Sequence, residues 1–218
     1  MSNKPRLQLA LDHTRLDAAL QTAERLRPHV DIIEAGTILC ISAGIQAVSA
    51  LRERCPQHTL VADLKVADAG GTLAQQAFGH GANWMTVICA APLATMASAL
   101  EVAQRHQGEI QIELFGRWTL EDAQQWRDLG IRQAIYHRGR DAQASGQTWS
   151  HQDLDLMKAL SDLGIELSVT GGITPTDLPL FKDIAVTAFI VGRALAEATD
   201  PLAAAGQFRS AIDDIWRS

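Results

Sequence analysis

Short apolar segments alternate with longer amphipathic segments along the whole chain. The short segments are nearly continuous apolar runs, which is typical of parallel strands that are covered on both faces. Eight such runs occur, at residues 7–12, 30–35, 59–65, 84–89, 110–114, 133–137, 166–170 and 186–191. The pattern therefore predicts a strand–helix unit that is repeated eight times.

The segments between these runs carry apolar residues at helical spacing. One face of the last segment is formed by Leu202, Ala205, Phe208, Ile212 and Trp216. Residues suited to a helix start stand at Asp12-His13-Thr14, at Thr119 with Asp122, and at Thr174-Pro175. Eight such units in 218 residues predict a small (β/α)8 TIM barrel, because a doubly wound sheet more often has about five or six strands.

The composition indicates a single barrel domain over residues 1–218. Apolar residues make up 47% of the chain, enough for one large core, and no linker-like stretch divides it. The net charge of −6 and the lack of Lys/Arg runs argue against a nucleic-acid partner and favour a small molecule. Without a leader-like start or an apolar stretch of roughly 18 residues, we expect a cytoplasmic protein that does not contact membranes.

Three cysteines, Cys40, Cys55 and Cys89, are widely spaced and form no C-x-x-C pair. Neither a disulfide framework nor a structural zinc site is indicated by this spacing. We interpret the cysteines as small apolar residues in or near the core, with a reactive thiol as the alternative.

Two carboxylates and one ammonium group cluster at the end of the third predicted strand. In the segment Val61-Ala62-Asp63-Leu64-Lys65-Val66-Ala67-Asp68, Asp63 and Lys65 lie two residues apart and should point to the same face. Catalytic groups of a barrel lie at the C-terminal ends of its strands, and a buried lysine needs a carboxylate partner. The Asp-x-Lys-x-x-Asp cluster therefore predicts an active site.

Ionisable residues stand at the ends of other predicted strands as well. Together with the third strand they are Asp12, Glu34, Asp63, Lys65, Glu113 and His137. All should meet at one mouth of the barrel. Any one of them could belong to a structural ion pair, but six at one end favour an active site.

Glu34 and Asp63 are candidate metal ligands on neighbouring strands. Two carboxylates together with waters and substrate oxygens suit Mg²⁺ better than zinc, which prefers His or Cys. The alternative is that both carboxylates neutralise Lys65 or Arg140.

Two glycine motifs follow the seventh and eighth predicted strands: Thr170-Gly171-Gly172-Ile173 and Val191-Gly192-Arg193-Ala194. In TIM barrels these two loops often bind phosphate through backbone N–H groups and a helix N-terminus. Arg193 would add a planar cation. Gly-Gly is also an ordinary turn signal, but the paired positions predict a phosphate site.

The segment 138–150, after the sixth strand, is longer and more polar than an ordinary connection. Long loops in compact domains are often functional, so we expect this one to contribute to the site. The alternative is a solvated surface loop.

The chain resembles the orotidine 5'-monophosphate decarboxylase superfamily, and within it the 3-keto-L-gulonate 6-phosphate decarboxylases. The likeness covers essentially the whole chain and is carried by Ala10-Leu11-Asp12, Ile33-Glu34-Ala35-Gly36-Thr37, Ala62-Asp63-Leu64-Lys65-Val66-Ala67-Asp68, Tyr136-His137-Arg138-Gly139-Arg140-Asp141, Val169-Thr170-Gly171-Gly172 and Val191-Gly192-Arg193. Phe115 and Arg117 differ from the family form, which bears on substrate preference rather than on reaction class.

The resemblance implies the decarboxylation of 3-keto-L-gulonate 6-phosphate to L-xylulose 5-phosphate and CO₂, as in L-ascorbate catabolism. An enediolate forms on loss of CO₂, and Mg²⁺ on Glu34 and Asp63 is expected to stabilise its developing oxyanions. Lys65 would add a fixed positive charge. His137, together with Arg140 acting through an ordered water, is expected to supply the proton.

The resemblance also implies roles for the remaining site residues. Asp12 and Thr170 would hold substrate hydroxyls, and Glu113 would orient the substrate or a water. Asp63 and Asp68 would keep Lys65 protonated. In the family the second Asp of this motif reaches across a dimer interface, so Asp68 implies an obligate homodimer whose active sites are shared between subunits.

Two other functions remain open. A 3-hexulose 6-phosphate synthase joins formaldehyde to an enediolate of ribulose 5-phosphate on the same scaffold. Arg140 and Thr170 favour the decarboxylase, because the synthases tend to carry smaller apolar residues there. A non-catalytic sugar-phosphate sensor would keep the phosphate loops but has no need for Asp63, Lys65 and Asp68 together.

Overall fold

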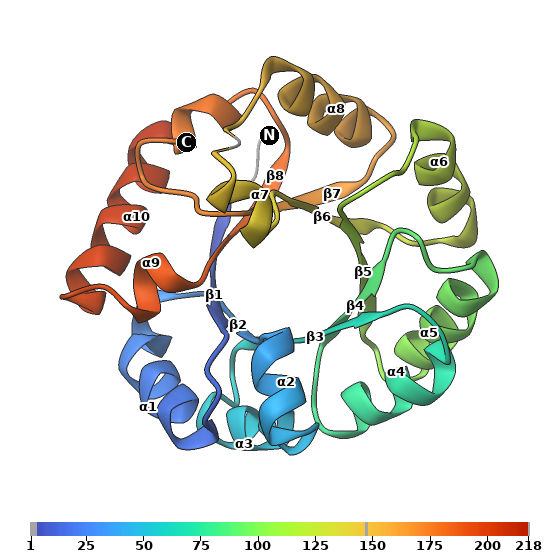
Figure 1. The fold of residues 1–218 in the computed structure, drawn as a ribbon, viewed down its shortest axis with the longest axis horizontal. Helices are drawn as coiled ribbons and strands as arrows, with labels where there is room; N and C mark the ends of the chain where they lie inside the picture. Colours follow the sequence, from blue (N-terminus) through green and yellow to red (C-terminus); the bar gives the residue numbers. More distant parts are fainter. Residues whose placement is uncertain (1–3, 147, 218) are drawn as a thin grey trace.

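Eight parallel strands close into a barrel in sequence order in the computed structural model, which describes residues 4–146 and 148–217 (Figure 1). The strands are β1 (Arg6–Leu11), β2 (Ile32–Ala35), β3 (Thr59–Val66), β4 (Trp84–Ile88), β5 (Glu109–Leu114), β6 (Gln133–His137), β7 (Glu166–Thr170) and β8 (Val186–Val191). The predicted (β/α)8 TIM barrel is confirmed, and each predicted strand end lies within two residues of the observed one.

Helices surround this ring of strands. They are α1 (Leu16–Leu26), α2 (Thr37–Ala43), α3 (Gln46–Arg54), α4 (Gly70–Gly79), α5 (Leu93–Arg105), α6 (Leu120–Leu129), α7 (Arg140–Ala144), α8 (His151–Asp162), α9 (Arg193–Ala196) and α10 (Pro201–Ile215), with the 3₁₀ turns η1 (Arg27–His29) and η2 (Leu178–Phe181). Most of them pack outside the barrel, whereas α7 lies over the ring of strands (Figure 1). Within the described residues, no helix is both long and apolar enough to cross a membrane.

The prediction of a strand–helix unit repeated eight times is wrong at the seventh unit. Between β7 and β8 the described chain forms only η2. Pro179 lies in its first turn, and it would interrupt an α-helix that began at the predicted start Thr174. Thr174, expected at a helix start, instead closes a turn: its N–H and its hydroxyl each donate to Asp177 Oδ2 at 2.8 Å.

The other two predicted helix starts had opposite outcomes. Thr119 and Asp122 form a capping box at the start of α6, as predicted. The start at Asp12-His13-Thr14 is wrong, because α1 begins at Leu16 and the Asp12 carboxylate accepts a hydrogen bond from Arg140 instead.

The main core lies between the strands and the helices. In α10 the predicted apolar face packs into it, except that Leu202 remains 39% exposed. Cys55 is buried and Cys40 and Cys89 are partly buried, all as free thiols. Burial raises the pKa of Cys40 to about 12, which keeps this thiol protonated at neutral pH and argues against the reactive alternative for it.

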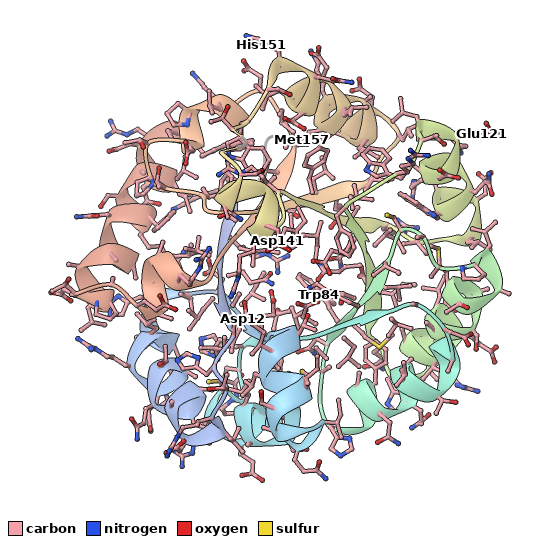
Figure 2. All side chains as sticks on the ribbon, viewed as in Figure 1. Asp12, Trp84, Glu121, Asp141, His151 and Met157 are labelled. Carbon is pink, nitrogen blue, oxygen red and sulfur yellow. The ribbon has the colours of Figure 1, made fainter. Side chains whose placement is uncertain are left out.

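Two small apolar clusters lie apart from the main core, inside the barrel. Ile32, Val61 and Ala188 pack together with Trp84, which is labelled in Figure 2. Ala10, Ile135 and Ile190 form the second cluster, and all three line the cavity described next. The barrel is therefore a packed core whose apolar layer supports the site.

Candidate active site

A cavity of about 540 Å³ lies at the carboxyl ends of the strands. Twelve of the thirteen predicted site residues line it: Asp12, Glu34, Asp63, Lys65, Glu113, His137, Arg140, Thr170, Gly171, Gly172, Gly192 and Arg193. Asp12 lies near the centre of the view in Figure 2, whereas Glu121 and His151 lie at the rim of the molecule. The structure thus brings together residues from seven strand ends, as the barrel predicts.

Lys65 lies between two carboxylates in this cavity. Its Nζ is 2.5 Å from Asp63 Oδ2 and 3.0 Å from Glu113 Oε1. Although burial alone would lower the pKa of Lys65, the charges of Asp63 and Glu113 raise it above its ordinary value. The ammonium group is therefore held charged at the cavity wall.

The backbone at Lys65 is irregular. Its φ is +46°, and the pairing between β3 and β4 shifts between Ala62 and Val66. The Lys65 N–H donates to Thr86 Oγ1 at 2.9 Å. A positive φ is uncommon for a residue with a long side chain, so simple strand alternation does not explain how Lys65 meets Asp63.

Asp63 is 6% exposed, and its oxygens accept from several donors. Oδ2 accepts from the hydroxyl of Thr37 at 2.7 Å and from its N–H at 3.3 Å, and Oδ1 accepts from Thr86 Oγ1 at 2.7 Å. Although burial would raise the pKa of Asp63, Lys65 and these hydrogen bonds hold it below its ordinary value. Asp63 is thus ionised.

Sequence reasoning missed the roles of Thr37 and Thr86. Thr86 is the one hydroxyl residue in the apolar run 84–89, which was an available signal. Thr37 directly follows Gly36, at the end of the second strand. Polar residues in otherwise apolar strand ends are therefore informative even when they are uncharged.

Glu34 lies on β2 and is also 6% exposed. Its Oε2 accepts from Gln8 Nε2 at 2.5 Å. Burial, followed by the charges of Asp63 and Asp12, raises the pKa of Glu34 well above its ordinary value. No ion pair to Glu34 occurs within residues 4–146 and 148–217.

The carboxylates of Glu34 and Asp63 are the kind of donors that a magnesium ion prefers. A buried carboxylate beside two others is stabilised by a cation, and hard oxygen donors suit Mg²⁺. The described residues include no group of three or more His, Cys, Asp or Glu arranged for a metal, and the predicted ligands are the two carboxylates Glu34 and Asp63. The alternative, that both carboxylates neutralise Lys65 or Arg140, holds only for Asp63, which pairs with Lys65. Arg140 pairs with Asp12 and not with Glu34.

His137 is held by Glu113. Its Nδ1 lies 2.5 Å from Glu113 Oε1, and its ring makes an edge contact with Phe115 at 6.1 Å between centroids. Glu113 is 2% exposed, and its Oε2 is buried without a hydrogen-bond partner in the described chain. That oxygen is available to accept from a substrate hydroxyl or a water.

Arg140 reaches the cavity from α7. The segment 138–150, predicted as a polar loop, contains this short helix, and Arg140 is its first residue. The guanidinium Nη2 donates to Asp12 Oδ2 at 2.9 Å. Gly36 leaves room for Asp12, since a Cβ at Gly36 would lie 2.3 Å from Asp12 Oδ1.

The glycine loops form the opposite side of the cavity. Gly171 has φ +121° and Gly172 has φ +62°, which glycine adopts without strain. Gly192 precedes α9, and Arg193 is the first residue of that short helix. Thr170 donates its hydroxyl to Ile190 O at 3.1 Å. Backbone N–H groups and one arginine are thus available to bind an anion.

Asp68 does not join this cluster in its own chain. It is exposed beyond the end of β3 and lines a separate groove with residues of α4 and α5. Within the described chain, Lys65 pairs with Asp63 and Glu113, so Asp68 is not the second carboxylate partner there. Glu113, which we expected to orient the substrate, is the second carboxylate partner of Lys65 instead.

Comparisons with known proteins identify the family of the chain. The family model described as "Orotidine 5'-phosphate decarboxylase / HUMPS family" matches residues 5–208. The 3-keto-L-gulonate-6-phosphate decarboxylase SgbH of Escherichia coli (strain K12) is 66% identical over 214 residues, which cover 98% of this chain and 97% of that protein.

Solved structures show the same likeness. The crystal structure of KGPDC from Streptococcus mutans in complex with D-R5P superposes with a TM-score of 0.96 at 45% identity, covering 98% of this chain and 100% of that one. The 3-hexulose-6-phosphate synthase from Salmonella typhimurium has a TM-score of 0.90 at 27% identity, covering 96% and 99%.

Proposed function

The chain belongs to the orotidine 5'-phosphate decarboxylase / HUMPS family, and from this premise we propose that it decarboxylates 3-keto-L-gulonate 6-phosphate to L-xylulose 5-phosphate and CO₂. That makes it a carboxy-lyase, like the SgbH decarboxylase of Escherichia coli. The observation that carries the proposal is the Lys65 ammonium, held charged between Asp63 and Glu113 in a cavity whose other side is a glycine-rich loop.

Loss of CO₂ from a β-keto acid leaves an electron pair that is held as an enediolate. Lys65 stabilises the negative charge that develops on the substrate oxygens, and it does so from a fixed position because two carboxylates hold it. Glu34 and Asp63 would hold Mg²⁺, which when bound supplies a Lewis acid for the same oxygens.

His137 and Arg140 supply the proton that completes the reaction. Glu113 fixes the His137 ring through Nδ1, which leaves Nε2 to face the substrate or an ordered water. Arg140 lies on the same cavity and would orient that water. Asp12 and Thr170 bind substrate hydroxyls, and the free Oε2 of Glu113 accepts from substrate or water.

The phosphate of the substrate binds at Gly171, Gly172, Gly192 and Arg193. These residues line one side of the cavity, with Arg193 exposed toward its opening. Backbone N–H groups of glycine loops bind phosphate oxygens, and the guanidinium adds a bidentate cation. The phosphorylated sugar acid is thus anchored away from the reacting carbons.

The functional unit is a homodimer in this proposal. Asp68 carries a carboxylate outside its own cavity, at the end of the strand that bears Lys65. A second copy of the chain would use it beside its own Lys65. The pathway that we infer for the enzyme is L-ascorbate catabolism, in the cytoplasm.

The rival reaction is that of a 3-hexulose 6-phosphate synthase. One such synthase has nearly the same fold as this chain, so the scaffold alone does not separate the two activities. Arg140, which points into the cavity, favours protonation over attack on formaldehyde. The test measures CO₂ release from 3-keto-L-gulonate 6-phosphate against formaldehyde incorporation with ribulose 5-phosphate. Faster incorporation of formaldehyde would reverse the assignment.

The variant Lys65→Ala distinguishes an enzyme from a non-catalytic sugar-phosphate sensor. This change should abolish turnover and leave the affinity for inorganic phosphate largely intact, because the phosphate loop lies across the cavity from Lys65. Turnover that survives the substitution would exclude the catalytic role.

A further inference from the structure

Arg138 lies behind the glycine loop, outside the cavity. Its Nε and Nη2 donate to Gly171 O at 2.9 and 2.6 Å, and Nη2 also lies 3.4 Å from Gly172 O. Arg138 does not line the active-site cavity, whereas both glycines do. The two carbonyl groups therefore point away from the cavity, toward the guanidinium.

The orientation of these carbonyls fixes the orientation of the next amides. The peptide bonds of the described residues are trans, and in a trans peptide the N–H points opposite to the C=O. The N–H groups of Gly172 and Ile173 thus point toward the cavity. Neither of them donates a hydrogen bond to another atom of residues 4–146 or 148–217. They are available to a bound anion.

Further contacts hold Arg138 in place. Its guanidinium lies over the Trp149 ring, 4.6 Å from the centroid. Its N–H donates to Thr170 O at 3.1 Å, and its carbonyl accepts from Gln143 Nε2 at 2.8 Å. Gln143 belongs to α7, the helix that begins with Arg140. Arg138 therefore connects the glycine loop to the helix that carries Arg140.

The loop packs closely against Arg138 at Gly171. A Cβ on Gly171 would lie 2.3 Å from the Arg138 carbonyl oxygen, and a Cβ on Gly172 would lie 2.3 Å from Gln143 Oε1. The Arg138 carbonyl is backbone and cannot shift cheaply, so the loop at Gly171 packs directly against the backbone of Arg138, whereas the Gln143 amide at the end of its side chain could turn away from Gly172.

We propose that Arg138 is a positioning residue for the substrate phosphate, which it serves by turning the Gly171 and Gly172 carbonyls outward so that the following amides face the anion. The proposal rests on the proposed function only in requiring that the ligand carries a phosphate. Arg138 itself does not touch the phosphate.

The test compares Arg138→Met, Arg138→Lys and Arg127→Met in the full chain. Met keeps length and packing but removes the donors, and Lys keeps the charge but not the fork of two donors. Arg127 is a matched control, because its Nε donates to Leu163 O at 3.0 Å and it does not line the cavity. Dissociation constants for inorganic phosphate, KM and kcat for 3-keto-L-gulonate 6-phosphate, and melting curves are measured for each.

Arg138→Met should weaken phosphate binding by about tenfold or more, because the Gly172 and Ile173 amides would no longer be held toward the phosphate and hydrogen bonds to a charged group would be lost. In Arg138→Met, KM should rise by a larger factor than kcat falls. Arg138→Lys should restore only part of the phosphate affinity. Arg127→Met should bind phosphate like the unaltered chain. The proposal is overturned if folded Arg138→Met matches Arg127→Met, or if Lys restores full affinity, since charge alone would then suffice. An unaltered chain that binds no phosphate also overturns it. If the chain binds phosphate, loses it in Arg138→Met, and releases no CO₂, the proposed reaction fails and this inference stands.

Discussion

The backbone of Lys65 and the side chain of Thr86 are joined by a 2.9 Å hydrogen bond, and the same hydroxyl donates to Asp63 at 2.7 Å. One threonine on β4 thus supports both members of the ion pair, through the backbone of one and the carboxylate of the other. A residue at positive φ is strained and persists only where its surroundings hold it. Thr86 supplies part of that support.

Thr86→Val should therefore lower both activity and stability. The substitution keeps the shape but leaves the Lys65 N–H without an acceptor and removes one donor to Asp63. The free energy of unfolding should fall by about 1–3 kcal/mol, the range for a buried polar group that loses its partner. Denaturant titration and steady-state kinetics measure the two effects. Thr86→Ser, which keeps the hydroxyl, should stay close to the original in both; equal behaviour of Val and Ser would contradict the role.

Magnesium binding should depend on pH through Glu34. Burial and the charges of Asp63 and Asp12 raise the pKa of Glu34, so its protonated form persists to higher pH than in an ordinary glutamate. A cation binds only the ionised form. The affinity for Mg²⁺ should therefore increase as the pH rises, and binding should release protons.

Titration calorimetry in two buffers of different ionisation enthalpy measures this release. Glu34→Gln should weaken Mg²⁺ binding and remove the pH dependence together. A Mg²⁺ affinity that is the same across the acid and neutral range would show that Glu34 is not a ligand. The control Asp12→Asn should keep a proton release but move it to lower pH, because the substitution removes one of the charges that raise the pKa of Glu34.

The barrel was predictable because its signal is repeated. Parallel strands covered on both faces require apolar runs, and the chain contains eight of them at regular intervals. Once these runs form a barrel, Asp12, Glu34 and His137 must meet at one end, even though they are far apart in the sequence. The apolar pattern and the barrel topology were therefore sufficient to predict most of the residues that line the cavity.

Local conformation was harder to predict. The irregular backbone at Lys65 is bonded to Thr86, which lies 21 residues away on the neighbouring strand, so the sequence around Lys65 itself does not indicate the contact. In α7, five residues form a helix whose Gln143 side chain donates to the Arg138 carbonyl, although the sequence is as polar as a loop. Tertiary contacts decide such short elements, because isolated short helices are marginal in water.

Gly171→Ala and Gly206→Ala should change stability in opposite directions. Gly171 has φ +121°, and a Cβ there would collide with the Arg138 carbonyl, so alanine should cost about 1–3 kcal/mol of backbone strain or more. Gly206 lies within α10 with no atom within 4 Å of an added Cβ, and alanine should stabilise that helix by about 1 kcal/mol.

Thermal and denaturant unfolding of both variants measure the difference, and Gly171→Ala should also bind inorganic phosphate more weakly. Gly206→Ala serves as the control for the chemistry of the substitution. If Gly171→Ala were as stable as the original chain, the loop geometry described above would be wrong.

A mixture of two inactive variants should recover activity if Asp68 acts on the partner subunit. Asp68 lies outside its own cavity, so in a dimer each site would combine Lys65 of one subunit with Asp68 of the other. Lys65→Ala and Asp68→Ala should each abolish turnover. A dimer that contains one of each variant has one intact site and one site that lacks both residues.

Random assembly from equal amounts makes half of the dimers mixed, each with one working site of two, so about a quarter of the original activity should return. Co-expression with two different tags isolates the mixed dimer, which should have about half of the original turnover per dimer. A double variant, Lys65→Ala with Asp68→Ala, co-expressed with the original chain controls for exchange, since that mixed dimer has no site with both residues intact. If the two single variants stay inactive when mixed while size-exclusion chromatography shows a dimer, Asp68 does not complete the partner's site. Its exposed carboxylate would then act in its own chain or not in catalysis at all.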